Sequence, residues 1–267
     1  IPDDDGATFS EPQEITETFN KFHQDYDWKV CATGPGHGIQ LSNGRMIIPV
    51  WLSDGSGTEM GKGNLGHRPS IITSIHSDDN GLSWERGDIV CRHNDNIDDN
   101  ILINPSETIP VQLNDGSVML NIRSESEIDR RLIAVSPDGS TNWTIRGFDN
   151  ALLEPVCMAS IIKSNQLNDK DTNDILFINP DNLENIMNPP GHLNENDRKR
   201  LTVKLSLDDA KTWPISKVIE EGPSGYSDVA QLASGDFLCI YECEIIERRC
   251  DDKYIRVSKF DKNWLIE

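Results

Sequence analysis

Residues 77–84 read Ser-Asp-Asp-Asn-Gly-Leu-Ser-Trp, and we take the fold from this octapeptide because it recurs along the chain. Residues 136–143 (Ser-Pro-Asp-Gly-Ser-Thr-Asn-Trp) and 206–213 (Ser-Leu-Asp-Asp-Ala-Lys-Thr-Trp) repeat its Ser, Asp and Trp in register, and residues 4–9 are an incomplete copy ending in Phe9. In a hairpin turn the Asp carboxylate accepts backbone N–H bonds, and the Trp ring folds back on the apolar base. The copies, which we call Asp-boxes, therefore indicate a structural repeat without a catalytic role.

The segments between the Asp-boxes each contain three β-prone runs, and a fourth strand is expected after each box. Helical periodicity is essentially absent. A four-stranded unit repeated around an axis is a β-propeller blade, so we predict an all-β propeller forming one domain over residues 1–267. The expected strands are near 12–16, 38–41, 45–52, 70–77, 107–113, 117–123, 131–136, 156–163, 174–179, 201–206, 228–232, 237–241 and 253–260.

The amino-acid composition limits the classes of molecule that the protein is expected to bind. The 267 residues include 45 acidic and 25 basic side chains, a formal charge of −20, which argues against nucleic acid or an anionic membrane as a partner. No apolar run approaches the ~18 residues of a membrane span. An anionic substrate would need a local cluster of arginines. The six cysteines form no CxxC pair or zinc spacing; a Cys243–Cys250 disulfide and free thiols both remain open.

Residues 222–242 predict a β-hairpin, with Ala-Ser-Gly-Asp at 233–236 as its turn. Gly222, Pro223 and Gly225 force an irregular approach, so Tyr226 enters at the start of a strand while Glu242 lies at the far end of the next. This layout suits a site, although an aromatic ring packed under a turn would look the same.

These motifs together resemble the exo-α-sialidases (neuraminidases) of the bacterial and animal type. Further matching phrases are Ala-Thr-Gly-Pro-Gly-His-Gly-Ile-Gln-Leu at 32–41 and the run from Ser106 to Gly116, and the resemblance extends over the whole chain. It implies a six-bladed β-propeller that acts on a sialylated glycan or free sialic acid without metal or cofactor. The family uses a Tyr nucleophile, a Glu partner, an Asp acid/base and three arginines on the substrate carboxylate.

The resemblance assigns roles by motif. Tyr226 matches the nucleophile, Glu107 its base, Arg123 and Arg198 two carboxylate-binding arginines, and Glu242 the acid that braces the first arginine. The side-chain types suit the chemistry, because an ionised nucleophile would be repelled by the carboxylate on the anomeric carbon whereas a neutral phenol would not. An unperturbed Tyr titrates near ~10, so it needs an adjacent base at neutral pH.

Several assignments stay open. Arg200 is the alternative to Arg198, and Arg123 and Arg198 could singly be ordinary strand-edge arginines. Five further side chains are candidates to line the pocket: Trp51, His67, Arg68, Cys157 and Met158. Core packing explains Trp51 and Met158 equally well.

Two family parts have no match in this sequence. The first arginine and the acid/base Asp belong to the first blade, and Asp3, Asp4, Asp25 and Asp27 lie in the wrong blade or loop to replace the acid. The chain is expected to cover about four and a half blades: the tail of the second, the next three and the strands of the sixth. We therefore expect the functional protein to include an N-terminal portion or a companion chain.

The resulting hypothesis is an exo-α-sialidase with a retaining mechanism. One alternative is a non-catalytic, lectin-like propeller that binds sialoglycans and lacks the acid. Another is a purely structural Asp-box propeller, which would leave Glu107, Arg123, Arg198 and Tyr226 unexplained. Cysteine content and a glycan substrate together favour a secreted or periplasmic location.

Overall fold

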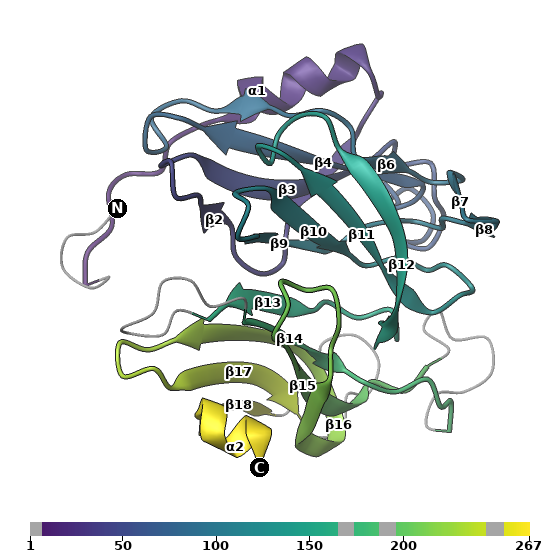
Figure 1. Ribbon diagram of the computed structural model, residues 1–267. Helices are drawn as coiled ribbons and strands as arrows, with labels where there is room; N and C mark the ends of the chain where they lie inside the picture. The colour runs from purple at the N-terminus through teal and green to yellow at the C-terminus, as the bar shows by residue number, and fades with distance from the viewer. Residues whose placement is uncertain (1–6, 165–173, 187–195, 244–253) are drawn as a thin grey trace.

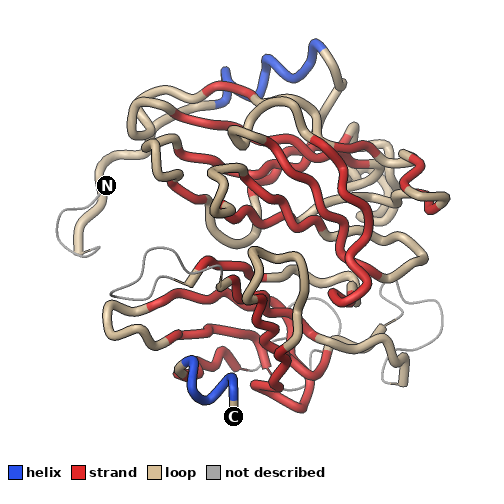
Figure 2. Tube along the Cα trace, viewed as in Figure 1, coloured by secondary structure: helices blue, strands red, loops and turns tan. Residues whose placement is uncertain are grey.

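A computed structural model describes residues 7–164, 174–186, 196–243 and 254–267, and its regular structure is predominantly β-strand (Figures 1 and 2). The strands form curled antiparallel sheets that stand side by side, with the sheets up to β12 in the upper half of Figure 1 and those from β13 onward below. None of the helices in these ranges has the length and apolar character needed to cross a membrane.

The first sheet has an inner strand in two pieces. β1 and β2 both pair with β3, and the Gly34-Pro35-Gly36 turn separates them. The sequence predicted only the second piece, because this turn disguises the first. The sheet is completed by β4, β5 and β6, and the bounds are β1 (Val30–Thr33), β2 (Ile39–Gln40), β3 (Met46–Ser53), β4 (Ser70–Ser77), β5 (Glu85–Arg86) and β6 (Cys91–Arg92).

The second sheet has the predicted blade order of three strands, an Asp-box and a fourth strand. Its spatial order is β12-β11-β10-β9, so each strand pairs with its neighbour in the chain. A small hairpin, β7 with β8, precedes it. The bounds are β7 (Asn96–Ile97), β8 (Asn100–Ile101), β9 (Thr108–Gln112), β10 (Val118–Ile122), β11 (Arg130–Ser136) and β12 (Thr144–Leu153).

The third sheet joins two units through one long strand. The first part of β16, up to Pro223, pairs with β15, and the part from Ser224 pairs with β17. β16 is therefore the outer strand of one blade and the inner strand of the next. The bounds are β13 (Ser160–Lys163), β14 (Ile175–Pro180), β15 (Lys199–Ser206), β16 (Ile215–Gln231), β17 (Phe237–Cys243) and β18 (Tyr254–Phe260), followed by α2 (Lys262–Ile266).

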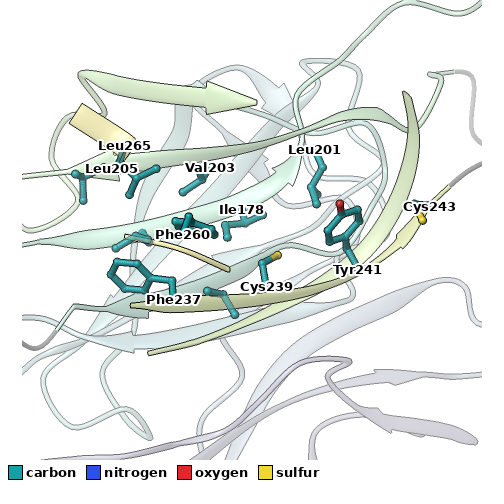
Figure 3. Packing of buried hydrophobic residues seen from close by; sticks show 12 residues of the cluster. Ile178, Leu201, Val203, Leu205, Phe237, Cys239, Tyr241, Cys243, Phe260 and Leu265 are labelled. Atoms are coloured by element: carbon teal, nitrogen blue, oxygen red, sulfur yellow. The ribbon is translucent and has the colours of Figure 1, made fainter. Parts of the chain in front are cut away.

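The inner strands lie next to one another around a common axis. β9 contacts β2 and its partner β3 on one side and β13 on the other, and β13 in turn contacts β16. Apolar clusters fill the spaces between and within the sheets. In the last unit β17 alternates buried and less buried residues, so Phe237, Cys239 and Tyr241 face Val203 and Ile178 (Figure 3).

The chain before β1 differs from the prediction. A strand was expected near residues 12–16, but the structure has helix α1 (Thr16–Asn20) followed by the 3₁₀ turn η1 (Lys21–Gln24). Phe19 and Phe22, one helical turn apart, are buried against β3 and β4 of the first sheet. Residues 11–15 have no regular structure, and the helical turn that follows them is favoured by the burial of these two rings. The described residues thus hold three four-stranded units and three strands of a fourth.

The Asp-boxes form the expected hydrogen-bonded turns. In the second box Asp138 Oδ1 accepts the amides of Ser140 (2.9 Å) and Thr141 (2.8 Å), and its Oδ2 accepts Arg45 Nη1 (3.1 Å). The Trp rings of the three complete boxes pack on the apolar clusters. Phe9 is 82% exposed, so the incomplete copy does not pack its ring; Asp4 and its two neighbours lie outside the described residues.

We expect these carboxylates to make the fold acid-sensitive. Hydrogen bonds from Ser83 and Ser77 lower the pKa of Asp79 to about 2. Burial alone would raise the pKa of Asp138, but the Ser140 and Thr141 amides hold it well below its usual range. A carboxyl whose pKa is lowered on folding stabilises the fold above its unfolded pKa of ~3.9, and the contribution disappears as pH falls towards the folded value. Urea unfolding between pH 5 and pH 2 should therefore show a steep loss of stability.

Asp138→Asn tests the origin of this effect. It should lower the free energy of unfolding at neutral pH by about 1–2 kcal/mol, because an amide accepts these hydrogen bonds less strongly. The partial exposure of the site to water keeps the loss within this range. The variant should also lose less stability on acidification than the parent. An unchanged pH profile would show that other carboxylates dominate.

Candidate active site

The antiparallel pair β9–β10 places two predicted residues side by side. Glu107 comes directly before β9 and Arg123 directly after β10, and the backbone ladder continues through them, with Arg123 N donating to Glu107 O at 3.1 Å. Arg123 Nη1 donates to Glu107 Oε2. Their side chains are 12% and 13% exposed, so this ion pair is largely withdrawn from water.

Tyr226 arrives at the same point from a distant part of the chain. It lies in the second half of β16, which is the inner strand of the last unit. Its phenol Oη donates to Glu107 Oε1, 119 positions away, and accepts from Arg123 Nη1 at 3.0 Å. The phenol thus lies between a proton acceptor and a cationic donor.

Arg198 covers the ring of Tyr226. It stands directly before β15, and its guanidinium carbon lies 5.4 Å from the centroid of that ring. Its Nη2 donates to the carbonyl of Val156 at 2.5 Å. Arg200, the alternative from the sequence, lies exposed within β15 and, among the residues that the structure describes, forms no hydrogen bond or ion pair with Tyr226 or Glu107. The geometry therefore brings Arg198 to the phenol.

Glu242 binds the backbone of Tyr226. From β17, its Oε2 accepts the Tyr226 amide at 2.8 Å, across the register shift between Ser224 and Ser227. The resemblance gave this acid the task of bracing an arginine. That arginine has no match in this sequence, and in the structure Glu242 fixes the strand at the residue that carries the phenol.

The electrostatic environment keeps the phenol protonated and the arginine charged. Burial raises the pKa of Tyr226, Arg123 lowers it and Glu107 raises it again, and the result lies well above the ordinary value. Burial works to lower the pKa of Arg123, but Glu107, Tyr226 and Glu154 together outweigh it and raise that pKa. At neutral pH the site therefore presents a neutral phenol, whose proton must pass to a base before the oxygen can attack.

Two buried donors lack a protein partner. Arg123 Nε and Arg198 Nε have no hydrogen-bond acceptor among the described residues. Leaving such donors unpaired costs free energy unless a ligand or water accepts from them. Both donors belong to guanidiniums, whose N–H groups suit a small anion such as a carboxylate.

The five other pocket candidates differ in burial: three are core residues and two are exposed or partly exposed. Cys157 is fully buried, and burial raises the pKa of its thiol to about 11, so it lies beneath the site as an inert neighbour. Met158 (4% exposed) and Trp51 (9%) are also core residues. His67 is exposed and contacts the Trp51 ring, with centroids 5.4 Å apart, whereas Arg68 is held by the carboxylate of Glu125.

A buried ion pair that was not predicted from the sequence lies behind the site. Arg131 and Glu154 are 0% and 1% exposed and bind one another. The one available signal was a charged residue at the head of the apolar run Leu-Ile-Ala-Val at 132–135, where a strand with a buried face can place it in the core.

No metal cluster lies at the predicted residues in the part of the chain that the structure describes, and a cavity in the last unit lies away from them. Within the described ranges, no cluster of three or more His, Cys, Asp or Glu side chains is placed to hold a metal ion. A cavity of about 560 Å³ lies on the last unit, between β16, β18 and α2, and none of the predicted residues lines it; its walls are Ile219, Asp236, Ser258, Lys259, Phe260, Asp261 and Trp264.

The chain is similar in sequence to a known domain family and to several sialidases. The BNR repeat-like domain family matches residues 2–239. A sialidase of Micromonospora viridifaciens is 27% identical over 248 residues, covering 90% of this chain and 32% of the relative. Human Sialidase-3 is 26% identical over 271 residues, covering 90% of this chain and 60% of the relative.

Solved structures agree with this likeness. A Hadza microbial sialidase superposes with a TM-score of 0.72 and 25% identity, over 99% of this chain and 43% of its own. The intramolecular trans-sialidase of Ruminococcus gnavus, at 20% identity, shares the fold with a TM-score of 0.69 over 99% of this chain and 50% of its own. The chain thus spans half or less of these two structures, and it belongs to the BNR-repeat sialidase family of β-propellers.

Proposed function

We propose that this chain carries the nucleophile and part of the carboxylate-binding site of an exo-α-sialidase that works with retention of configuration. The observation that supports it most is the position of the Tyr226 phenol between the Glu107 carboxylate and Arg123 Nη1. A phenol placed between a base and a guanidinium suits attack on an anomeric carbon that itself bears a carboxylate.

The proposed reaction has two displacements. Arg123 and Arg198 bind the substrate carboxylate, Glu107 accepts the phenolic proton, and Tyr226 Oη forms a bond to the anomeric carbon as the bond to the leaving oxygen breaks. Water then attacks the same carbon as the bond to Tyr226 Oη breaks, Glu107 returns its proton to the phenolate, and the proton lost by the water passes to solvent. A sugar leaving group also needs a proton from an acid, for which this sequence offers no matching residue.

We propose that this acid and a further arginine come from a segment outside this sequence, in the same polypeptide or a companion chain. The last unit supports this, because three apolar residues of its edge are exposed: Ile240 (48%), Ile255 (60%) and Val257 (61%). They lie on one face of β17 and β18, with Ile240 opposite Val257. A face of this kind is typically covered by another part of the protein.

Two substrates separate the possible outcomes. A nitrophenyl sialoside needs little acid assistance, because nitrophenolate is a stable anion, whereas a sialylated lactose needs a proton on its leaving oxygen. We expect this chain to release sialic acid from the first and far more slowly from the second. Saturable binding without release from either would favour the lectin-like alternative, and neither binding nor release would overturn the proposal.

The carboxylate-binding role of Arg198 can be tested by affinity. Arg198→Met should weaken binding of N-acetylneuraminic acid by about 10- to 100-fold, because a hydrogen-bonded charge pair contributes ~1.5–3 kcal/mol. Arg200→Met is the matched control, two positions away and exposed, and should leave binding unchanged in calorimetry. Equal losses in the two variants would point to a nonspecific effect of charge.

A further inference from the structure

The segment of residues 154–157, which we call the 154–157 bracket, links the buried ion pair to the arginine over Tyr226. It follows β12 directly and runs beneath the site. Its Val156 carbonyl is the acceptor for Arg198 Nη2, at 2.5 Å. The position of this carbonyl therefore sets where the Arg198 guanidinium lies.

Both ends of the bracket are fixed by the buried pair. Glu154 Oε1 accepts the amide of Cys157 at 2.9 Å, and its other oxygen accepts Arg131 Nη1. The same Nη1 also donates to the carbonyl of Cys157 at 2.9 Å. Arg131 is anchored in turn to Asn121 of β10, with Nε to Oδ1 at 2.6 Å. Each of these bonds is buried, so both backbone polar groups of Cys157, its N–H and its C=O, are held.

Val156 has a backbone conformation that a β-branched residue rarely adopts. Its φ is +58°, in the left-handed region that normally favours glycine or asparagine. Such a conformation persists where its surroundings over-determine it, and strained residues of this kind gather at functional sites. Here the surroundings are the Glu154 and Arg131 contacts, and the result is a carbonyl directed at Arg198.

We propose that Arg131 and Glu154 are positioning residues, which hold the 154–157 bracket so that the Val156 carbonyl aims Arg198 at the substrate carboxylate. The inference rests on the proposed function for the identity of the ligand. The aim of Arg198 itself is a property of the unliganded protein and can be measured separately.

The test uses a variant that removes the pair without stranding a charge. Replacing a buried ion pair by apolar side chains of similar volume is often neutral for stability, so Arg131→Met/Glu154→Leu should remain folded. NMR of the arginine side chains, with the Arg198 signals assigned by Arg198→Lys, then reports guanidinium motion without any ligand. We expect restricted rotation in the parent and averaged signals in the double variant.

A matched control and a second variant complete the NMR test. Lys204 lies on β15, the strand that follows Arg198, and Lys204→Met removes a hydrogen bond to the Ala151 carbonyl of β12 and an ion pair with Asp181 without touching the bracket. It should leave the Arg198 signals unchanged. Val156→Gly keeps the carbonyl and accommodates a positive φ, so it should fold and still loosen Arg198. Arg198 signals that match the parent in both bracket variants would overturn the inference.

Affinity for N-acetylneuraminic acid supplies a readout that general destabilisation would not mimic. The double variant should bind about tenfold more weakly, and in an Arg198→Met background the same double change should add nothing. An undiminished further loss in that background would show that the pair does not act through Arg198, and would overturn the inference. If the parent binds no sialic acid, the proposed function fails, and the NMR result alone decides on the bracket.

Discussion

Tyr226→Phe should lower kcat for a nitrophenyl sialoside by ~10³-fold or more, the order expected when a covalent nucleophile is removed. The substitution deletes the one oxygen that Glu107 and Arg123 both contact. Affinity for N-acetylneuraminic acid should change by less than about threefold, since the arginines remain. Steady-state kinetics and calorimetry on the same preparations separate the two effects.

Tyr241→Phe is the matched control for this prediction. Tyr241 lies on β17, is 4% exposed, and pairs its hydroxyl with Ser258 Oγ at 3.2 Å, away from Glu107. Loss of that hydrogen bond should cost about 1 kcal/mol of stability and leave kcat unchanged. Full turnover in Tyr226→Phe would exclude the covalent mechanism, and equal losses in the two variants would indicate a general response to removing a buried hydroxyl.

Glu154→Ala should destabilise the protein by about 3–5 kcal/mol, because it leaves the Arg131 guanidinium buried without its counter-charge. Burial raises the pKa of Glu154 above its ordinary value, and the charge of Arg131 offsets part of this rise. Reversible urea unfolding at neutral pH measures the change. A loss of this size is comparable with a large part of the total stability of a typical domain.

The Arg68–Glu125 pair provides the comparison for this measurement. Its side chains are 24% and 21% exposed, so Glu125→Ala leaves an arginine that water can reach, and the expected loss is about 1 kcal/mol. The double variant Arg131→Met/Glu154→Leu should recover most of the stability lost in Glu154→Ala. Similar values for Glu154→Ala and Glu125→Ala would show that burial of the pair carries no special cost.

The repeating architecture could be predicted because its causes are local. Each complete Asp-box carries its own Ser, Asp and Trp within eight residues, and these make the turn wherever they occur. Glu107 and Arg123 flank one hairpin, so their meeting follows from pairing β9 with β10. In contrast, the encounter of Tyr226 with Glu107 spans 119 positions and was predictable only through the family resemblance.

The parts that could not be predicted depend on distant packing. The helical turn containing Phe19 and Phe22 forms because both rings bury against another sheet, which outweighs local propensity. The left-handed backbone at Val156 and the Arg131–Glu154 pair have no spacing signature, since their partners come from separate strands. Such features become visible only when the strands are placed in space.

Because β16 belongs to two blades, the placement of the Tyr226 phenol depends on the neighbouring blade. Side chains alternate between the two faces of a strand, so a one-residue slip between β15 and the first half of β16 would turn Tyr226 to the opposite face unless the irregularity after Ser224 absorbed it. Under the proposed mechanism, folding intermediates in which β15 has not yet paired would therefore lack a correctly placed nucleophile.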